Sequence, residues 1–317
     1  MVKRKLYEIM KPLVSVVIPV YNRENLIARC LKAIFLQTYE NIEIIVVDNA
    51  STDRTWDVLK KYEREHLNLK IFRNTQNLGP VKNWKRCVDK ANGKYIKIQW
   101  SDDWVDKEYL TQTVDVLEND PEIGFVFTPT YIHIDNKTHI LYAKIKKNKQ
   151  KLYKFINYFS CDWLGFPSSP GNALFRAIDV RNNLIIDIPN VLNLDFKNFG
   201  AGNDLLLYLM CYPKYKYFYV TNKPLSHFLS HVDSFTASND LKAYYLLAVK
   251  YYVTSILKDK YLIRNFNNAL RITNFIHRNK YQKIVDNNYN YSLLILIKIS
   301  IGKIFCYIYQ SIIWHFY

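Results

Sequence analysis

The sequence predicts an α/β protein in which a mostly parallel sheet is flanked by helices, and three observations carry this prediction. Residues 13–20 and 42–47 are apolar, largely β-branched runs, which are typical of strands buried on both faces. Residues 23–36 between them have the apolar spacing of a helix. Further strands and helices of about 10–15 residues alternate up to residue 120, and this alternation indicates βαβ units.

The other elements follow in order along the chain. Up to residue 120 the pattern predicts helices at 55–65, 81–90 and near 106–118, and strands at 69–72 and 95–98. Beyond Pro121 it predicts a helix at 203–211 and strands at 123–130, 131–142, 172–175 and 215–220, the last strand of the chain. Residues 144–154 carry six lysines and no acid, which we interpret as a solvated loop. From about residue 241 onward we expect helices throughout.

The composition excludes several classes of protein. Apolar residues make up 49% of the 317 residues and charged residues 23%, which excludes a disordered or fibrous chain. The net charge of +16 indicates an anionic partner: a nucleotide phosphate, a nucleic acid or a lipid headgroup. Five widely spaced cysteines argue against a disulfide framework or a zinc site and fit a reducing cytosol. Glu8 and Lys11 interrupt the N-terminal apolar stretch, so we expect no signal peptide.

Acidic residues fall where the predicted strands end. Asp48 follows the second strand, Asp102 and Asp103 follow the strand at 95–98, and Asp204 begins a predicted helix. Ligands of parallel sheets lie beyond the carboxyl ends of the strands, so we expect Asp48, Asp102 and Asp103 to face one crevice. Carboxylates there suit a hard divalent cation that also takes substrate phosphate oxygens. The alternative is that Asp102 and Asp103 cap the following helix.

Three stretches carry a resemblance to a known family: residues 14–59, which begin VSVVIPVYN, residues 77–96, which begin NLGPVKNW, and residues 101–110, SDDWVDKEYL. In this order they resemble the inverting, nucleotide-sugar-dependent family 2 glycosyltransferases. The resemblance implies the GT-A fold, with a Rossmann-like sheet and here a C-terminal helical extension. It implies a catalytic domain at 1–240, with a nucleotide-sugar half at about 12–120 and an acceptor half at 121–240. A basic helical region follows at 241–317.

The resemblance also implies a donor site. Its residues would be Pro19, Tyr21 and Asn22 at the nucleotide base, Asp48 at the base or ribose, and Asn77, Gly79 and Asn83 along the donor. Arg73, just after the third strand, either meets the nucleotide or lies at the surface.

The family's metal-binding D-x-D motif corresponds to Trp100-Ser101-Asp102, so a tryptophan stands in place of the first acid. The resemblance leaves Asp102 as the ligand of Mn²⁺ or Mg²⁺, with Asp103 as its neighbour and Ser101 in the donor site.

Two motifs in the second half resemble the family more loosely. Asp204, in the segment AGNDL, matches the family's catalytic base, and the alternative is an N-cap of the helix that follows. The segment SHFLSHVDSFTAS at 226–238 looks like the family's His-x-x-Ser segment, which would place His231 and Ser234 near the donor diphosphate or the metal. Taken alone, His231 would be a loop or structural histidine.

The implied reaction moves a sugar from a nucleotide diphosphate donor, with UDP expected, to a lipid-linked or polymeric glycan of a bacterial cell surface. A sugar nucleotidyltransferase would need a glycine-rich loop after the first strand, and residues 14–22 contain no glycine. A basic nucleic-acid-binding protein would carry a recognisable motif, and none occurs, so we expect no nucleic-acid partner.

The C-terminal stretch 291–317 is strongly apolar but is interrupted by Lys298 and Lys303. No uncharged run within it reaches the roughly 18 residues that a spanning helix needs. Its polar stripe fits an amphipathic helix lying in an anionic membrane surface, and residues 241–317 carry a net charge of +9. We therefore expect a cytoplasmic protein, peripheral at the inner face of the membrane. Packing on the domain core and a homo-oligomer interface are the alternatives.

Overall fold

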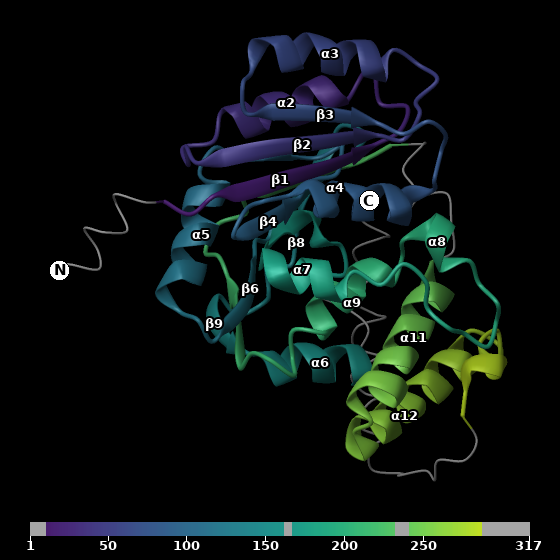
Figure 1. The fold of residues 1–317 in the computed structure, drawn as a ribbon. Helices are drawn as coiled ribbons and strands as arrows, with labels where there is room; N and C mark the ends of the chain where they lie inside the picture. The colour runs from purple at the N-terminus through teal and green to yellow at the C-terminus, as the bar shows by residue number, and fades with distance from the viewer. Residues whose placement is uncertain (1–10, 162–166, 232–240, 287–317) are drawn as a thin grey trace.

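The structure, a computed structural model, describes residues 11–161, 167–231 and 241–286 (Figure 1). Its main sheet has eight strands in the order β3-β2-β1-β4-β10-β6-β11-β9. These are β1 (Val14–Val20), β2 (Ile42–Asp48), β3 (Leu69–Arg73), β4 (Tyr95–Ile98), β6 (Ile123–Phe127), β9 (Asn148–Lys151), β10 (Ala173–Arg176) and β11 (Tyr217–Val220). The four strands from β3 to β4 are parallel, and β10 runs antiparallel between β4 and β6. The predicted α/β class with a mostly parallel sheet is confirmed.

Alternate strand residues point to opposite sides of this sheet, and because both sets are apolar, helices cover both faces. Val16, Ile18 and Ile44 belong to one apolar core, whereas Val17 and Ile45 belong to the other. The first core is closed by α2 (Ile27–Phe35), α3 (Thr55–Glu65) and α5 (Tyr109–Asn119). The second core is closed by α4 (Pro80–Lys90), α6 (Leu152–Cys161), α7 (Ala177–Asn183), α8 (Phe196–Phe199), α9 (Asn203–Leu209), α11 (Lys242–Tyr251) and α12 (Lys260–Ile276). Burial on both faces explains why these strands are continuous apolar runs in the sequence.

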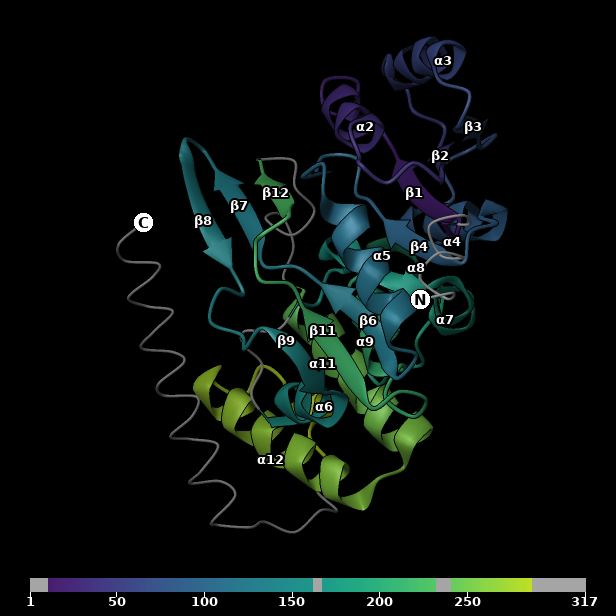
Figure 2. The same ribbon diagram turned by 90° about the vertical axis from the view of Figure 1, so that its left-hand side faces the viewer.

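A second sheet of four strands stands beside the main one, in the order β5-β12-β7-β8 (Figure 2). Its strands are β5 (Trp104–Val105), β7 (Thr130–Ile134), β8 (Lys137–Leu141) and β12 (Ser226–Ser230). The indole of Trp104 stacks on His227 of β12 and on His133 of β7, and the Arg29 guanidinium lies 3.9 Å from the indole centroid. This sheet ties the segment after Asp103 to the segment before His231.

Three sequence predictions need correction. Residues 144–154 are not a loop, because β9 pairs with β11 and α6 begins at Leu152. The strand at 215–220 is not the last, because β12 follows and pairs with β7 over five positions. The strand predicted at 131–142 is a hairpin of β7 and β8, which turns at Asp135 with a left-handed φ of 51°. In the first two cases pairing with a distant strand decides a structure that the local pattern does not contain, and in the third the chain turns back on itself within the predicted strand.

The expected C-terminal helices begin with α11 and α12, which are separated by a π-helical stretch (Tyr252–Leu257). Leu246 of α11 and Phe266 of α12 are fully buried in the second core. The amphipathic helix expected at 291–317 and the candidate donor residue Ser234 lie outside the described residues. Among the helices that the structure does describe, none has the length and apolarity to span a membrane.

Candidate active site

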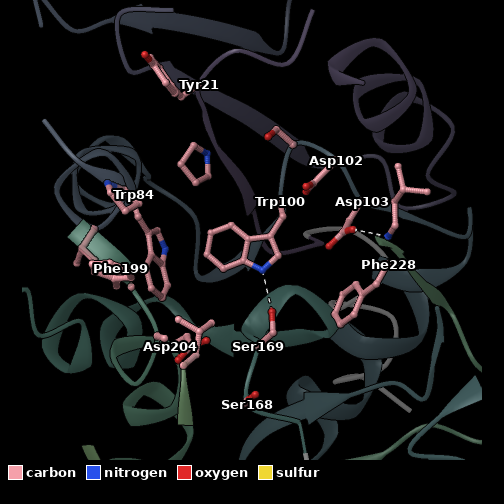
Figure 3. Close-up of a pocket in the computed structure, with 18 of the residues that line it drawn as sticks. Tyr21, Trp84, Trp100, Asp102, Asp103, Ser168, Ser169, Phe199, Asp204 and Phe228 are labelled. Atoms are coloured by element: carbon pink, nitrogen blue, oxygen red, sulfur yellow. Dashed lines mark hydrogen bonds between the residues drawn. The ribbon is translucent and has the colours of Figure 1, made fainter. Parts of the chain in front are cut away.

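A pocket of about 740 Å³ opens at the carboxyl ends of β1 and β4, in the size range of small-molecule sites (Figure 3). It lies between the main sheet, α4, the segment before α9 and the second sheet. Its lining includes the predicted residues Pro19, Tyr21, Asn77, Asn83, Ser101, Asp102, Asp103 and Asp204. The order of β2, β1 and β4 in the sheet brings these distant segments together.

The loops after β1 and β2 are tied together beside this pocket. The Asn22 side chain accepts a hydrogen bond from the Thr52 amide at 2.8 Å, and the Asn22 amide donates to Ser51 Oγ at 2.9 Å. Asn22 has a left-handed φ of 49°, which asparagine tolerates better than most residues. This geometry leaves Tyr21 40% exposed, on the wall of the pocket.

Asp48 lies at the same edge of the sheet, but its side chain does not line the pocket. The carboxylate is fully buried, accepts hydrogen bonds from Ser51 and pairs with Arg73 Nε at 3.0 Å. Arg73 also donates to the Ser51 carbonyl at 2.8 Å. Asp102 and Asp103 therefore line one crevice, as expected, whereas Asp48 does not. Its neighbour Asn49 lines the pocket instead.

An asparagine network forms the floor next to Asn49. Asn49 Nδ2 donates to Asn77 Oδ1 at 2.8 Å, and Asn77 Oδ1 also accepts from the Gly79 amide at 2.9 Å. Asn83 donates to the Val47 carbonyl at 2.9 Å and accepts from Asn74 at the same distance. Gly79 is the N-cap of α4 with a φ of 81°, a conformation that favours glycine. Asn77 and Asn83 thus face the pocket, while Gly79 shapes the turn beside them.

Asp102 lines the pocket and pairs with His231, which itself is not part of the pocket lining. Asp102 Oδ2 lies 3.1 Å from His231 Nε2 and 3.9 Å from Arg23 Nε, and both the Asp102 and His231 side chains are about one fifth exposed. Within the described residues no cluster of three or more His, Cys, Asp or Glu side chains converges on one point. A carboxylate oxygen and an imidazole nitrogen fit a divalent cation whose remaining ligands are substrate phosphate oxygens and water. Asp102 and His231 are therefore the residues that would hold it.

Asp103 lies behind Asp102 and fastens the second sheet. Its Oδ1 accepts a hydrogen bond from the Leu229 amide of β12 at 3.0 Å. Burial and the adjacent Asp102 raise the pKa of Asp103. Lys97 is fully buried nearby and donates to the Ile98 carbonyl at 2.6 Å and to the Gly171 carbonyl, and burial lowers its pKa to about 7. These buried groups position the turn that presents Asp102.

Trp100 lies in the middle of the pocket lining (Figure 3). Its indole Nε1 donates to Ser169 Oγ at 2.8 Å, and its ring packs edge-on against Trp84 with centroids 5.4 Å apart. A Cβ at Gly171 would lie 2.8 Å from the indole, so the chain there leaves room for this ring. The residue that replaces the first metal-motif acid is thus a fixed aromatic wall.

Asp204 lies at the start of α9 and is 8% exposed. The N-cap of α9 is Gly202 and not Asp204, but Asp204 Oδ1 accepts hydrogen bonds from the Gly202 and Leu205 amides, both at 2.7 Å, and so satisfies two amides at the helix start. Its Oδ2 accepts from the Tyr245 hydroxyl of α11 at 3.0 Å. Burial raises the pKa of Asp204 to about 7, and these hydrogen bonds oppose the rise. A carboxyl group with such a pKa is suited to exchange a proton near neutral pH.

Several pocket residues could not be singled out from the sequence. Tyr245, Ser169 and Phe199 reach the pocket from separate segments of the second half. Arg23 directly follows the predicted Pro-x-Tyr-Asn turn, and that position was the one available signal for it.

This sheet, with a pocket at the strand ends that joins polar groups to aromatic walls, defines an α/β protein with a small-molecule site at the carboxyl ends of its strands. Residues 15–182, more than half of the chain, match the sequence profile of Glycosyl transferase family 2, and the chain belongs to that family. The predicted family and its GT-A fold are confirmed.

Curated relatives match parts of the chain. The poly(ribitol-phosphate) beta-glucosyltransferase of Bacillus spizizenii is 40% identical over 100 residues, which are 31% of this chain and 16% of the relative. An uncharacterized glycosyltransferase of Methanocaldococcus jannaschii is 32% identical over 154 residues, 48% of this chain and 52% of the relative. The chain spans about half the length of these relatives, or less.

Among solved structures, S. aureus TarS 1-349 in complex with UDP-GlcNAc superposes with a TM-score of 0.65. The match covers 85% of this chain and 77% of that one at 19% identity, so it supports the fold alone.

Proposed function

We propose that this protein is an inverting glycosyltransferase that takes a sugar from a nucleotide diphosphate, expected to be UDP, and joins it to an acceptor hydroxyl. One observation carries the proposal: Asp102, which pairs with His231, and Asp204, whose pKa is raised, both line one pocket, and Figure 3 shows the two aspartates on different sides of Trp100. Such a site has a place for a diphosphate and a separate place for a base.

In this proposal Asp204 Oδ2 accepts the proton of the acceptor hydroxyl as its oxygen attacks the anomeric carbon. The bond from that carbon to the diphosphate oxygen breaks on the opposite face, and the nucleoside diphosphate departs. Trp100 and Trp84 form an apolar wall for the sugar between these two points. The Arg23 guanidinium, 3.9 Å from Asp102, adds positive charge where the leaving group becomes negative.

When bound by Asp102 and His231, Mn²⁺ or Mg²⁺ would supply further neutralisation of the diphosphate charge. The nucleotide would lie along Pro19 and Tyr21 and the asparagine network, with Asp48 and Arg73 supporting the loop after β2. Asn22 and Gly79 shape the turns there, and Ser101 presents its backbone or hydroxyl to the donor.

The acceptor class is proposed to be a lipid-linked or polymeric glycan of a bacterial cell surface. The poly(ribitol-phosphate) beta-glucosyltransferase among the relatives supports this class. We also propose that the apolar segment 291–317 holds the protein at the inner face of the cytoplasmic membrane, supported by its sequence pattern and the net charge of +9 in residues 241–317.

A nucleotide-sugar panel tests the proposed function. UDP-, GDP- and dTDP-sugars are incubated with the protein and Mn²⁺ or Mg²⁺, and the released nucleoside diphosphate is measured. We expect release from a UDP-sugar and stabilisation by UDP in a thermal-shift assay. Stabilisation by GDP or dTDP in place of UDP would overturn the UDP assignment, and no release from any donor would overturn the proposed function.

A further inference from the structure

A second concave site lies away from the catalytic pocket, at the edge of the main sheet. Its volume is about 500 Å³, and we call it the lysine groove. It is lined by Lys146, Lys149, Gln150, Lys151, Tyr153, Lys154 and Tyr217. Four of these seven residues are lysines, and none is an acid.

Secondary structure fixes which way these side chains point. β9 is the last strand of the main sheet and pairs with β11 alone. Gln150 is buried, and its Nε2 donates to the Lys147 and Lys149 carbonyls at 3.2 and 2.9 Å. Lys149 and Lys151 alternate with Gln150, so both are exposed on the other face. In α6, Leu152 is buried and Lys154 is exposed, which continues the basic surface around the corner.

The charge of the groove is only partly neutralised. Lys149 pairs with Asp120 at 2.6 Å and lies 3.9 Å from the Tyr217 ring centroid. Lys146, Lys151 and Lys154 form no ion pair with any residue that the structure describes. Three unpaired ammonium groups around one hollow repel one another, and an anion between them relieves that repulsion.

The groove is linked to the catalytic pocket through the chain. Leu141 and Tyr142 line the pocket, and Lys146, a few residues further on, already lines the groove. Lys147 Nζ lies 3.5 Å from the Tyr142 carbonyl, which holds this connection close. Along the chain, Lys146 is therefore the groove residue nearest to the pocket wall, four residues beyond Tyr142.

We propose that the lysine groove binds the phosphate groups of an anionic acceptor chain whose hydroxyl-bearing unit enters the catalytic pocket. The inference rests on the proposed function and narrows its acceptor to a polymer of phosphodiester-linked units. Concavity favours a chain over a membrane, because lipid headgroups present an extended surface and the groove offers only two tyrosines as apolar contacts.

Binding of inorganic polyphosphate, measured by calorimetry without any donor, tests this inference. The variant is Lys146→Gln/Lys151→Gln/Lys154→Gln. The matched control is Lys32→Gln/Lys61→Gln/Lys107→Gln, which removes three exposed lysines on α2, on α3 and before α5. We expect the groove variant to bind at least about tenfold more weakly and to show a shallower salt dependence, while the control stays within about twofold of wild type. Melting temperatures confirm that both variants are folded, and Lys151→Gln alone should weaken binding about two- to threefold.

Equal binding by the groove variant and the control would overturn the inference. Vesicles with and without phosphatidylglycerol form a second arm, and a groove variant that loses vesicle binding but keeps polyphosphate binding would make the groove a membrane contact. Because no turnover is needed, this test is independent of the nucleotide-release assay. If wild type binds polyphosphate through the groove but releases no nucleotide, the proposed function fails and the groove remains an anion site.

Discussion

At the scale of single residues, Trp100 is the side chain that distinguishes this pocket from the resembled family's metal motif. It stands where the resembled family has the first acid of its metal motif. The position therefore carries a fixed aromatic ring in place of a negatively charged carboxylate. With one carboxylate fewer, the proposed metal-binding pair is Asp102 and His231. The metal should therefore bind weakly until the donor diphosphate adds its oxygens.

Removal of the proposed metal ligand, Asp102, should abolish metal-dependent donor binding. For Asp102→Ala we expect the Mn²⁺-dependent part of UDP affinity to fall by about tenfold or more, since even outer partners of a metal site typically contribute 10–100-fold. Calorimetry with UDP, with and without EDTA, measures this. Wild-type turnover that survives EDTA would show that the reaction does not depend on the metal.

The aromatic wall should act on the sugar and not on the nucleotide. Trp100→Phe shortens the wall and removes the hydrogen bond to Ser169, so we expect the KM for the nucleotide sugar to rise about tenfold while UDP alone binds as before. Ser169→Ala removes only the hydrogen bond and serves as the matched control. If Trp100→Phe lost UDP affinity by as much as its KM for the nucleotide sugar rose, Trp100 would lie at the nucleotide instead.

At the scale of elements, the turn before α9 and the helix α11 together set the environment of Asp204. Gly202 has a φ of 90°, and a Cβ there would lie 2.9 Å from Ala248 of α11. This close approach brings the Tyr245 hydroxyl to Asp204 Oδ2. The helix that begins the predicted C-terminal region thus completes a site in the proposed catalytic domain.

Tyr245→Phe should move the acidic limb of the pH–rate profile upward. The base must be ionised, so the rate should rise with pH through about 7 in wild type. The lost hydrogen bond favoured the carboxylate, so its pKa should rise by roughly one unit or more, since a bond to a charged group contributes about 1.5–3 kcal/mol. The measurement is kcat against pH, with Tyr244→Phe on the same helix as control. If the acidic limb of Tyr245→Phe does not shift, Asp204 is not the group whose ionisation the pH–rate profile reports.

Elements buried on both faces could be predicted from the sequence, and elements decided by distant pairing could not. β1, β2 and β4 are apolar runs whose bounds were predicted to within a residue. By contrast, β9 (NKQK) has the composition of a loop and exists because its backbone pairs with β11. The same holds for the site: residues of contiguous motifs, such as Asp102, could be chosen, while Tyr245 and Ser169 are placed by packing alone.

At the scale of the whole molecule, positive charge is concentrated in the last quarter of the chain, where residues 241–317 carry a net charge of +9. Deletion of 291–317 should release the protein from phosphatidylglycerol vesicles, because it removes the apolar segment, and should leave UDP binding intact. Vesicle flotation of the truncated and full chains measures this. A truncated chain that still floats would place membrane contact elsewhere, and one that no longer folds would indicate packing on the core.

The central claim is that Asp204 is the base of a sugar transfer, and turnover of Asp204→Asn tests it most directly. The amide oxygen can still accept from Gly202 and Leu205, so the melting temperature and UDP affinity should change little. Asp259→Asn, which alters an N-cap acid of α12, is the matched control. At saturating donor and acceptor we predict a loss of about 10²–10⁴-fold in kcat for Asp204→Asn and none for the control. A folded, UDP-binding Asp204→Asn protein that turns over within a few-fold of wild type would contradict the claim.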